Sequence, residues 1–222
     1  MPSYLEEENL RLLLPRLHHV LDRTGEPYEI LVVDTAKPMD STADACAEHG
    51  AHYVPRRGGD SYGCAVRTGI EAARGEWILL MDADGSHSPE FIPELLKERP
   101  RADVVIASRY IDGGFSENSL PLRLMSLTLN VSYAVILGLP CKDVSNSFKL
   151  YRAPLLRAPS LRCENFDIVE EILFKLKRAA PSLRIVEVPF TFKKRMFGET
   201  KRDLLAFIVT YLYTILKLRF MP

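Results

Sequence analysis

The chain has 222 residues, of which 47% are hydrophobic and 26% are charged, and its 29 basic and 29 acidic side chains give a formal net charge of zero. This length and apolar content suffice for one globular domain with a large core. The even charge balance argues against a nucleic-acid-binding protein, because affinity for a phosphate backbone needs an excess of Lys and Arg on one face.

Strand and helix signals alternate along the first half of the chain. Short apolar runs rich in β-branched residues predict strands at 29–34, 52–54, 76–82 and 103–107. Amphipathic segments with polar or proline starts predict helices between them, at 41–48, 63–73 and 89–97. Apolar strands that alternate with helices are typical of a parallel sheet covered on both faces, so we expect an α/β fold.

The pattern changes beyond residue 109. It predicts a long apolar helix within 124–141, an irregular polar stretch at 143–147, a helix near 168–178, a strand at 184–192 and a helix at 204–216. The apolar segment 124–141 carries no charge but contains Asn130 and Pro140, and 204–216 has 13 uncharged residues before Lys217. Neither reaches the roughly 18–20 continuous apolar residues of a spanning helix. Both can be core helices, or both can lie along a membrane surface.

The four cysteines, Cys46, Cys64, Cys141 and Cys163, show no CxxC spacing. The first residues contain no basic region followed by an apolar run. We therefore expect reduced thiols, a cytoplasmic location and no signal peptide.

The stretch LMDADGSHSPE at residues 80–90 ends a predicted strand with two carboxylates, Asp82 and Asp84. Two such carboxylates are costly to bury unless a cation pairs with them. Mg²⁺ prefers a few carboxylates together with phosphate oxygens, so the pair is suited to holding a metal against the diphosphate of a nucleotide. Alone the motif is weak, since Asp at a strand end also forms turns and helix caps.

The surrounding sequence strengthens this interpretation. Asp34 ends the first predicted strand, and ligands of such sheets bind beyond the carboxyl ends of strands. The basic, glycine-rich segment RRGGDSYGCAVRTGIEAARG opens a helix at residues 56–75, where N–H and guanidinium groups could receive phosphate oxygens.

An ordered set of motifs resembles the inverting family-2 glycosyltransferases with the GT-A fold, and among them the dolichol- or polyprenol-phosphate mannosyltransferases. The motifs are PSYLEEENL, VVDTAKPMDST, GCAVRTGIEAARGEWILLMDADGSHSPEFIPELL, DVVIASRYIDGG, DVSNSFKLYR and EVPFTFKKRMFGETKRD. The resemblance implies a Rossmann-like, mostly parallel sheet flanked by helices, with an amphipathic C-terminal helix. It also implies a single domain in three parts: a nucleotide-sugar-binding half at 1–112, an acceptor-side half at 113–202 and an interfacial helix at 203–222.

The resemblance also implies roles for individual residues. Residues that match the nucleobase and ribose positions are Pro2, Tyr4, Glu6 and Asp34. Residues that match the metal and diphosphate positions are Asp82, Asp84 and Ser86, with Mg²⁺ or Mn²⁺ as cofactor. Basic residues that match positions facing the donor diphosphate or the acceptor phosphate are Arg109, Arg123, Arg195 and Lys201. Asp143 falls in a stretch that lines the reaction site in such enzymes, although turn formation explains an Asp there equally well.

Five basic residues and one acidic residue give segment 193–202 a net charge of +4. This segment precedes the terminal apolar helix, as a clamp on a lipid phosphate at a membrane surface requires. Surface solvation is the ordinary interpretation of an isolated charge, but the ordered motifs favour functional roles for Arg109, Arg195 and Asp84. His87 is interpreted as an orienting residue, and the other histidines show no ligand spacing.

The expected activity is metal-dependent transfer of a hexose, mannose or glucose, from a nucleotide sugar such as GDP-mannose to a polyprenyl phosphate. The enzyme would be peripheral on the membrane, with a small membrane subunit or a second copy as a further partner. One alternative is a soluble or polysaccharide acceptor, which needs a general base near Asp143. Another is a non-catalytic scaffold of the same fold. No GxGxxG follows a strand, which disfavours a dinucleotide oxidoreductase.

Three features depart from the family pattern. The family has a full strand ahead of the turn that Pro2 to Glu6 resembles, so we expect either that the true start lies upstream of Met1 or that another segment fills the resulting gap in the sheet. Leu5 stands where the family has Asn, and Thr35 stands where it has a second acid. The last change bears on nucleotide affinity and base choice.

Overall fold

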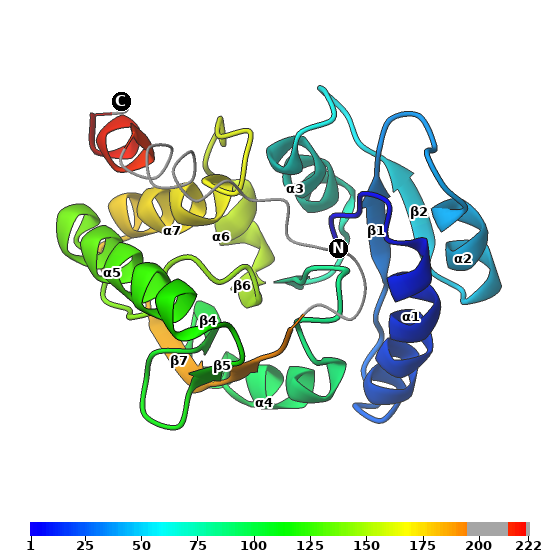
Figure 1. Ribbon diagram of the computed structural model, residues 1–222, viewed down its shortest axis with the longest axis horizontal. Helices are drawn as coiled ribbons and strands as arrows, with labels where there is room; N and C mark the ends of the chain where they lie inside the picture. The colour runs from blue at the N-terminus through cyan, green and yellow to red at the C-terminus, as the bar shows by residue number, and fades with distance from the viewer. Residues whose placement is uncertain (195–212, 221–222) are drawn as a thin grey trace.

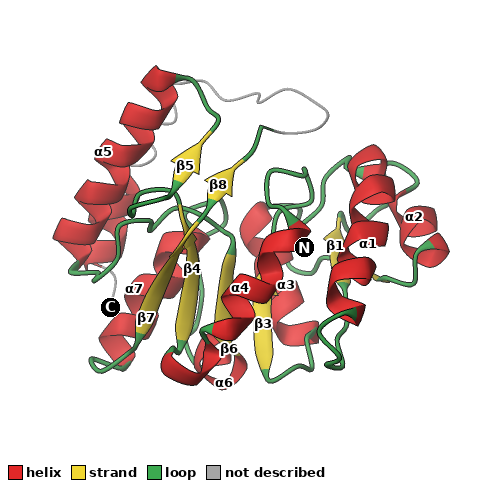
Figure 2. Ribbon diagram, turned by 90° about the horizontal axis from the view of Figure 1, so that it is seen from below, coloured by secondary structure: helices red, strands yellow, loops and turns green. Residues whose placement is uncertain are grey.

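The computed structural model describes residues 1–194 and 213–220. Helices cover both sides of a central sheet, which confirms the expected α/β architecture (Figure 1, Figure 2). The sheet has the order β3-β6-β4-β7, with bounds Trp77–Leu80, Lys149–Arg152, Val104–Ser108 and Ile185–Pro189. A parallel pair, β1 (Leu31–Asp34) and β2 (His52–Pro55), stands beside it, and β5 (Phe115–Ser116) pairs with β8 (Thr191–Phe192).

Strand β6 runs antiparallel to both of its neighbours, whereas β4 and β7 are parallel. The sequence did not predict β6, because its four residues, KLYR, place only two apolar side chains between charged ends. Its insertion between β3 and β4 puts the residues that precede β6 at the same sheet edge as those that follow β3 and β4.

The helices expected before residue 195 are present, with their ends shifted by up to four residues, and two further helices, α1 and α6, were not predicted. The α-helices are α1 (Glu7–Asp22), α2 (Thr42–Glu48), α3 (Tyr62–Ala72), α4 (Ile92–Lys97), α5 (Leu120–Leu137), α6 (Ala153–Arg157) and α7 (Ile168–Ala179). Two 3₁₀ turns are η1 (Pro89–Phe91) and η2 (Arg99–Arg101). Residues 213–220 are helical, whereas most of the predicted helix 204–216 lies outside the described residues.

The long apolar helix α5 begins four residues earlier than predicted and ends at Leu137. Gly138 follows it with φ of 64°, the left-handed conformation in which glycine commonly ends a helix. Pro140, two residues further on, cannot continue the helix.

Alternate residues of β4 enter two separate cores. Val104 and Ile106 pack in a cluster with α7, whereas Val105 and Ala107 pack with α1 and α4 on the other face. All five residues of β4 are buried, as the continuous apolar run predicts for a central strand. The division of the chain into parts at residues 112 and 202 stays a prediction.

The gap expected in the sheet lies between β1 and β3. Met1 to Ser3 pair with β1 near Val33, whose N–H donates to Met1 O at 2.8 Å. Beyond this short pairing, β1 and β3 flank a cavity of about 710 Å³, lined largely by apolar side chains that include Leu31, Trp77 and Leu79. Among residues 1–194 and 213–220, no strand occupies this space.

Leu5 adopts a left-handed conformation with φ of 55°. A side chain with a Cβ is strained there, whereas Asn tolerates the region better. The Leu5 side chain is 51% exposed, so little packing is lost on substitution. We expect Leu5→Asn to raise the free energy of unfolding by about 0.5–1 kcal/mol, measured by urea denaturation. Leu12 is equally exposed but lies within α1. Leu12→Asn should therefore lower the free energy of unfolding, because Asn has a lower helix propensity than Leu.

Candidate active site

The strand register brings four segments to one edge of the sheet. Leu80 and Ile106 both pair with Lys149, so residues after β3, residues after β4 and residues before β6 meet there. Ser108 pairs with Pro189, so the residues that follow β7 join them. The Asp82–Asp84 turn, Arg109, the stretch 142–147 and the start of the basic segment therefore surround a single region, as the predicted position beyond the strand ends requires.

Protein hydroxyl groups hold both carboxylates of the acidic turn. Asp82 accepts hydrogen bonds from the hydroxyl of Tyr62 at 3.0 Å and from Ser147 Oγ at 2.8 Å. Asp84 Oδ1 accepts from the N–H of Ser86 at 3.0 Å and from its hydroxyl at 2.5 Å. The turn is therefore shaped before any ligand binds. Ser86 donates both hydrogen bonds to Asp84 Oδ1, as a residue that orients the carboxylate would.

The donor set of this turn fits a hard divalent cation. The described residues contain no group of three or more His, Cys, Asp or Glu side chains that would hold a metal by themselves. Mg²⁺ is commonly bound by one or two carboxylates together with phosphate oxygens of a substrate. Asp82 and Asp84 supply the protein's share of such a site, and the remaining ligands would have to come from a bound phosphate group and water.

His87 links the acidic turn to two other segments. Its fully buried ring accepts the N–H of Asp82 at Nδ1, at 3.0 Å, so the proton lies on Nε2, which faces Asn146 Oδ1 at 3.1 Å. Asn146 Nδ2 in turn donates to the carbonyl of Ala107 at the end of β4, at 2.6 Å. Burial lowers the pKa of His87, which favours the neutral ring. The geometry agrees with the orienting role predicted for His87.

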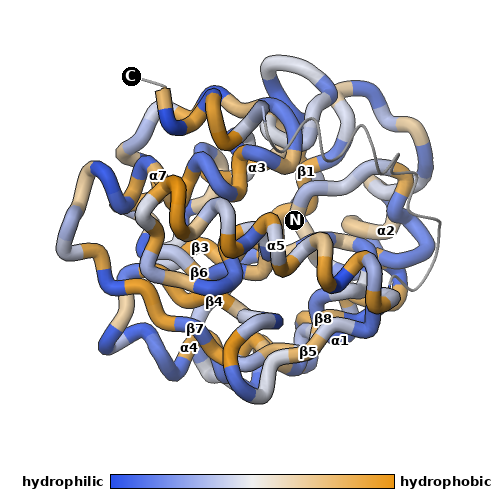
Figure 3. The backbone as a smooth tube through the Cα atoms, turned by 60° about the vertical axis from the view of Figure 1, so that its left-hand side comes forward, coloured by the Kyte–Doolittle hydropathy of each residue, from blue (hydrophilic) through white to orange (hydrophobic). Residues whose placement is uncertain are grey.

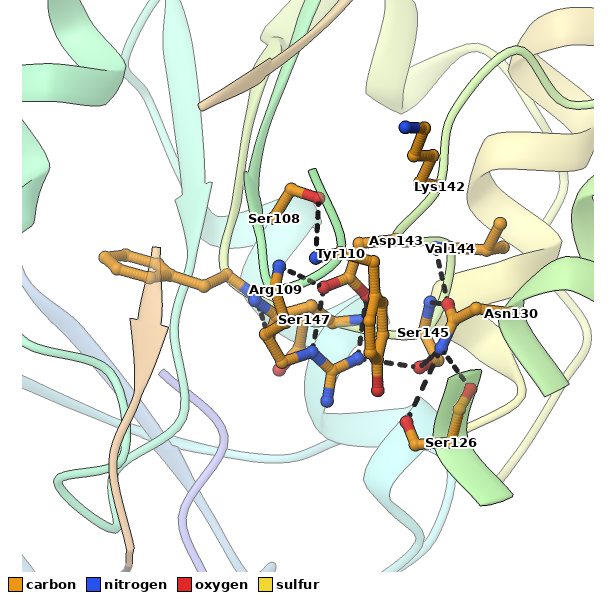
Figure 4. Close-up of polar contacts among 12 residues, drawn as sticks. Ser108, Arg109, Tyr110, Ser126, Asn130, Lys142, Asp143, Val144, Ser145 and Ser147 are labelled. Atoms are coloured by element: carbon orange, nitrogen blue, oxygen red, sulfur yellow. Dashed lines mark hydrogen bonds and ion pairs between the residues drawn. The ribbon is translucent and has the colours of Figure 1, made fainter. Parts of the chain in front are cut away.

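Arg109 and Asp143 form a buried ion pair at the same edge (Figure 4). Arg109 Nε and Nη2 donate to the two oxygens of Asp143 at 2.8 and 2.7 Å, and its backbone N–H donates to Oδ2 at 2.8 Å. Burial alone would raise the pKa of Asp143, but the charge and hydrogen bonds of Arg109 outweigh it and hold this pKa below its usual value. Asp143 is therefore a carboxylate that orients Arg109 and a weak general base.

Three buried or half-buried side chains that the sequence analysis did not select hold the stretch 142–147, hereafter the Asp143 loop. Glu187 on β7 accepts the N–H groups of Lys142 and Asp143 at 2.8 and 2.9 Å. Lys149 Nζ on β6 donates to Val144 O at 2.8 Å and also to Asn146 O. Asn130 on α5 accepts two further N–H groups. A lone amide inside the apolar run 124–141 was the available signal for Asn130.

Asp34, the residue predicted to contact the nucleotide, is 1% exposed at the end of β1. Its Oδ1 atom is buried and has no hydrogen-bond partner among the described residues, while Tyr53 donates weakly to Oδ2 at 3.5 Å. Burial raises the pKa of Asp34. An orphaned acceptor at a strand end fits a carboxylate that awaits a ligand hydroxyl.

Other predicted nucleotide residues lie near β1 with different exposures. Pro2 bridges to Val33, next to Asp34. Tyr4 is 55% exposed, and Glu6 accepts a hydrogen bond from Asn9 Nδ2.

Two residues of the glycine-rich segment 56–75, for which the sequence suggested a phosphate site, make packing contacts within the protein. Arg56 is buried and donates to the backbone carbonyls of Ser3, Asp34, Asp60 and Ser61, so it joins the N-terminal turn to the end of β1. Gly63 packs so closely that a Cβ there would lie 2.2 Å from the carbonyl of Cys163. Packing explains these two residues without a phosphate.

The remaining predicted basic residues divide between described and undescribed parts of the chain. The Arg123 guanidinium lies over the Phe115 ring, 4.5 Å from its centroid, and Arg109 lies 5.5 Å from the centroid of Phe192. Both rings belong to the β5–β8 pair. Arg195 and Lys201 lie outside the described residues. The N–H of Lys193, where the basic segment begins, donates to Ser86 O at 3.2 Å.

Comparisons with known proteins give one family. The sequence model of Glycosyl transferase family 2 matches residues 1–158. The chain is 36% identical over 215 residues to the undecaprenyl-phosphate mannosyltransferase of Micrococcus luteus, covering 90% of this chain and 85% of that one. It is 34% identical over 210 residues to the dolichol-phosphate mannosyltransferase of Pyrococcus furiosus, covering 90% of this chain and 57% of that one.

Solved structures with low sequence identity share the fold. Glucosyl-3-phosphoglycerate synthase from Mycobacterium tuberculosis, in complex with phosphoglyceric acid, matches all of this chain and 79% of its own, with a TM-score of 0.76 and 16% identity. The same synthase in complex with Mn²⁺, uridine diphosphate and glucosyl-3-phosphoglycerate matches with a TM-score of 0.75 and 17% identity, over all of this chain and 78% of its own.

Proposed function

The chain belongs to glycosyl transferase family 2 and is a glycosyltransferase of the GT-A fold, and from that premise we propose its donor, acceptor and metal. The enzyme transfers a hexose from a nucleoside diphosphate sugar to the phosphate of a polyprenyl phosphate at a membrane surface. The hexose is mannose or glucose, and the names of the relatives favour mannose. The anomeric carbon is inverted, and Mg²⁺ or Mn²⁺ is required. The names of the Micrococcus and Pyrococcus relatives support this acceptor and sugar, and the synthase complex with Mn²⁺ and uridine diphosphate supports the metal.

One observation carries the proposal: the hydrogen bond from Lys193 N–H to Ser86 O. It places the start of the basic segment 193–202 directly beside the Asp82–Asp84 turn. The first residue of a segment rich in basic side chains thus adjoins an acidic pair suited to a divalent ion, an arrangement that supports transfer between two phosphorylated substrates.

The proposed acceptor explains why the site needs no strong general base. A phosphate monoester loses its second proton near pH 6, so it is already an anionic nucleophile at neutral pH. The reacting bond forms between one of its oxygens and the hexose C1, while the bond from C1 to the nucleoside diphosphate breaks. The lowered pKa of Asp143 makes it a poor base, which argues against the alternative with a soluble hydroxyl acceptor.

The residues divide into donor and acceptor roles in this proposal. Asp82 and Asp84, the latter oriented by Ser86, would hold the ion, which when bound neutralises charge on the leaving diphosphate. Asp34 accepts a hydrogen bond from a ribose hydroxyl at Oδ1, which has no partner among the described residues. Pro2, Tyr4 and Glu6 line the nucleobase site. Arg109 and Arg123 face the acceptor phosphate, and Arg195 and Lys201 clamp the phosphates.

The exposed apolar side chains of α5 support a membrane surface as the place of action. Those most exposed on the helix are Leu120, Leu124, Val131, Val135 and Ile136. Figure 3 shows the backbone trace of α5 coloured by hydropathy, with hydrophobic residues recurring along the helix. Tyr213, Leu216 and Phe220 are exposed on the terminal helical segment. Among the described helices, α5 alone has the length and composition that could cross a membrane. Its opposite face packs against the protein through Leu129, Tyr133 and Leu137, and Asn130 on that face binds the Asp143 loop, which favours a helix that lies along the membrane surface.

Substitution of two exposed valines of α5 by aspartate tests this orientation. We expect Val131→Asp with Val135→Asp to reduce binding to vesicles of anionic phospholipid by about tenfold, because charged groups replace apolar area at the lipid boundary. Vesicle flotation measures the bound fraction. Leu12→Asp, on an exposed position of α1, is the matched control and should bind as the wild type does. Equal binding of all three proteins would remove α5 from the membrane contact.

Arg123→Ala is expected to raise KM for the polyprenyl phosphate by about 10-fold to 100-fold, the cost of one charged phosphate contact. KM for the donor should stay within twofold. Arg123→Lys retains the charge and should recover part of the loss. Arg74, whose side chain is 78% exposed beside Glu29, supplies the control Arg74→Ala, which should leave both constants unchanged. A change confined to the donor constant would move Arg123 to the donor side.

A donor and acceptor screen tests the function as a whole. GDP-mannose, UDP-glucose and UDP-N-acetylglucosamine are each offered with a short polyprenyl phosphate and with Mg²⁺, Mn²⁺ or EDTA. The expected result is metal-dependent glycosylation of the lipid phosphate by one donor. Transfer to water-soluble acceptors without lipid would replace the proposed acceptor. An absence of metal-dependent heat with every donor in calorimetry would identify a non-catalytic scaffold.

A further inference from the structure

Asn130 is a fully buried polar residue in the middle of the apolar helix α5. It lies on the buried stripe of this helix together with Leu129, Tyr133 and Leu137. A buried amide costs about 1–3 kcal/mol unless its hydrogen bonds are made, and an apolar side chain would serve a packing role at lower cost. The contacts of the Asn130 amide therefore indicate what the residue does.

Both ends of the Asn130 amide are used, and most of their partners belong to the Asp143 loop (Figure 4). Oδ1 accepts the N–H groups of Val144 at 2.7 Å and Ser145 at 2.9 Å. Nδ2 donates to Ser145 Oγ at 3.0 Å and to the carbonyl of Ser126, one turn earlier, at 2.7 Å. The side chain thus supplies hydrogen bonds that an irregular loop cannot obtain from a neighbouring strand.

These contacts continue into the ion pair of the site. Ser145 Oγ, which accepts from Asn130, also accepts from Arg109 Nη2 at 3.0 Å. The two N–H groups that Asn130 binds directly follow Asp143, whose carboxylate holds the same guanidinium. Asn130 therefore reaches Arg109 by two routes, through a hydroxyl and through the backbone next to Asp143. The other supports of the loop, Glu187 and Lys149, come from strands.

We propose that Asn130 is a positioning residue of the transfer reaction: it fixes the Asp143 loop against α5 and thereby sets the orientation of Arg109 toward the acceptor phosphate. The proposal rests on the proposed function, which places that phosphate at Arg109. Asn130 itself touches no substrate. Its position on α5 makes the helix with the exposed apolar face a direct support of the acceptor side of the site.

A double-mutant cycle separates this role from a purely structural one. Asn130→Ala is expected to lower kcat/KM for the polyprenyl phosphate by about 10-fold to 100-fold, with donor affinity in calorimetry unchanged. In an Arg109→Ala background, the same substitution should change kcat/KM by less than threefold, because its effect passes through Arg109. Losses that multiply in the double variant would overturn the proposal.

Two further variants test the proposal if Asn130→Ala does not fold well enough for kinetic measurements. Asn130→Asp retains the acceptor for both N–H groups but cannot donate to Ser145, and Ser145→Ala removes the hydroxyl between Asn130 and Arg109. Each should cost part of the same loss in kcat/KM. Leu129→Ala is the matched control, because it destabilises the adjacent buried position of α5 and should leave kcat/KM of the folded protein within twofold. An equal loss in Leu129→Ala would assign the whole effect to stability.

The wild-type protein distinguishes failure of the proposal from failure of the proposed function. Active transfer to polyprenyl phosphate with multiplying losses refutes the role of Asn130 alone. Transfer to a different acceptor refutes the proposed function, and the same cycle is then read with that acceptor. A wild type that transfers nothing refutes both.

Discussion

Replacement of Asp84 by Ala is expected to lower kcat for hexose transfer by about a thousandfold or more at saturating donor and metal. The carboxylate stands at the end of the turn that follows β3, where Ser86 orients it with two hydrogen bonds. Without it the leaving diphosphate loses the group that would hold its neutralising cation. Metal titrations of activity and of donor binding measure the effect, and the metal-dependent part of the binding heat should disappear.

Substitution of residues that contact Asp82 or Asp84 should lower kcat by smaller factors than Asp84→Ala. Ser86→Ala removes one hydrogen bond to Asp84 and retains the carboxylate, so its effect on kcat should be about tenfold. Tyr62→Phe removes one hydroxyl from Asp82 and should likewise cost far less than Asp84→Ala. Wild-type turnover of Asp84→Ala with saturating metal would refute the metal assignment and with it the proposed role of the acidic turn.

Asp143→Asn is expected to destabilise the protein by about 3–5 kcal/mol and to abolish most of the transfer activity. The neutral amide leaves the Arg109 guanidinium, whose side chain is only 9% exposed, without its counter-charge. Urea denaturation at pH 7 measures the stability. Asp103→Asn is the control, because Asp103 pairs with Arg184, whose side chain is half exposed, and solvent screens such a pair. Equal losses for the two variants would contradict a special role for the buried pair.

The same pair gives a dependence of stability on pH with a defined sign. Because Arg109 lowers the pKa of Asp143 in the folded protein below the value of 3.8 for an unperturbed Asp, the stabilisation is complete above that value. It is lost as the pH falls through the lower folded pKa. The stability difference between wild type and Asp143→Asn should therefore be constant from pH 7 to pH 5 and shrink below pH 4. A difference that grows on acidification would contradict this sign.

A paired replacement separates stability from catalysis at this site. Arg109→Met with Asp143→Leu removes both charges and keeps apolar volume, and buried pairs replaced in this way often retain stability. We expect stability closer to the wild type than that of Asp143→Asn, with transfer activity still lost. The site would then need the oriented guanidinium itself.

The sequence determined the parts of this protein that depend on neighbours along the chain. The continuous apolar runs identified β1, β3 and β4, since a strand buried on both faces needs no polar positions. The acidic turn at Asp82 and Asp84 could be recognised for the same reason, because carboxylates directly after such a run must lie at a sheet edge. The departure at Leu5 from the family's Asn was also visible in the sequence, because the turn from Pro2 to Glu6 has a recognisable pattern, but its left-handed conformation was not.

The contacts between segments distant in the sequence could be learned only from the folded chain. Lys149 to Arg152 form a strand because β3 and β4 offer edges on both sides, although their own pattern is too short to indicate one. Arg56 donates to the carbonyl of Asp34, and Asp143 pairs with Arg109, contacts that join residues more than 20 positions apart in the sequence. Asn130 interrupts an apolar run in the sequence. The packing of α5 on the Asp143 loop explains this polar residue, because the loop supplies hydrogen-bond partners for its amide. Burial and pairing set the chemistry of a polar side chain, and both depend on which segments the fold brings together.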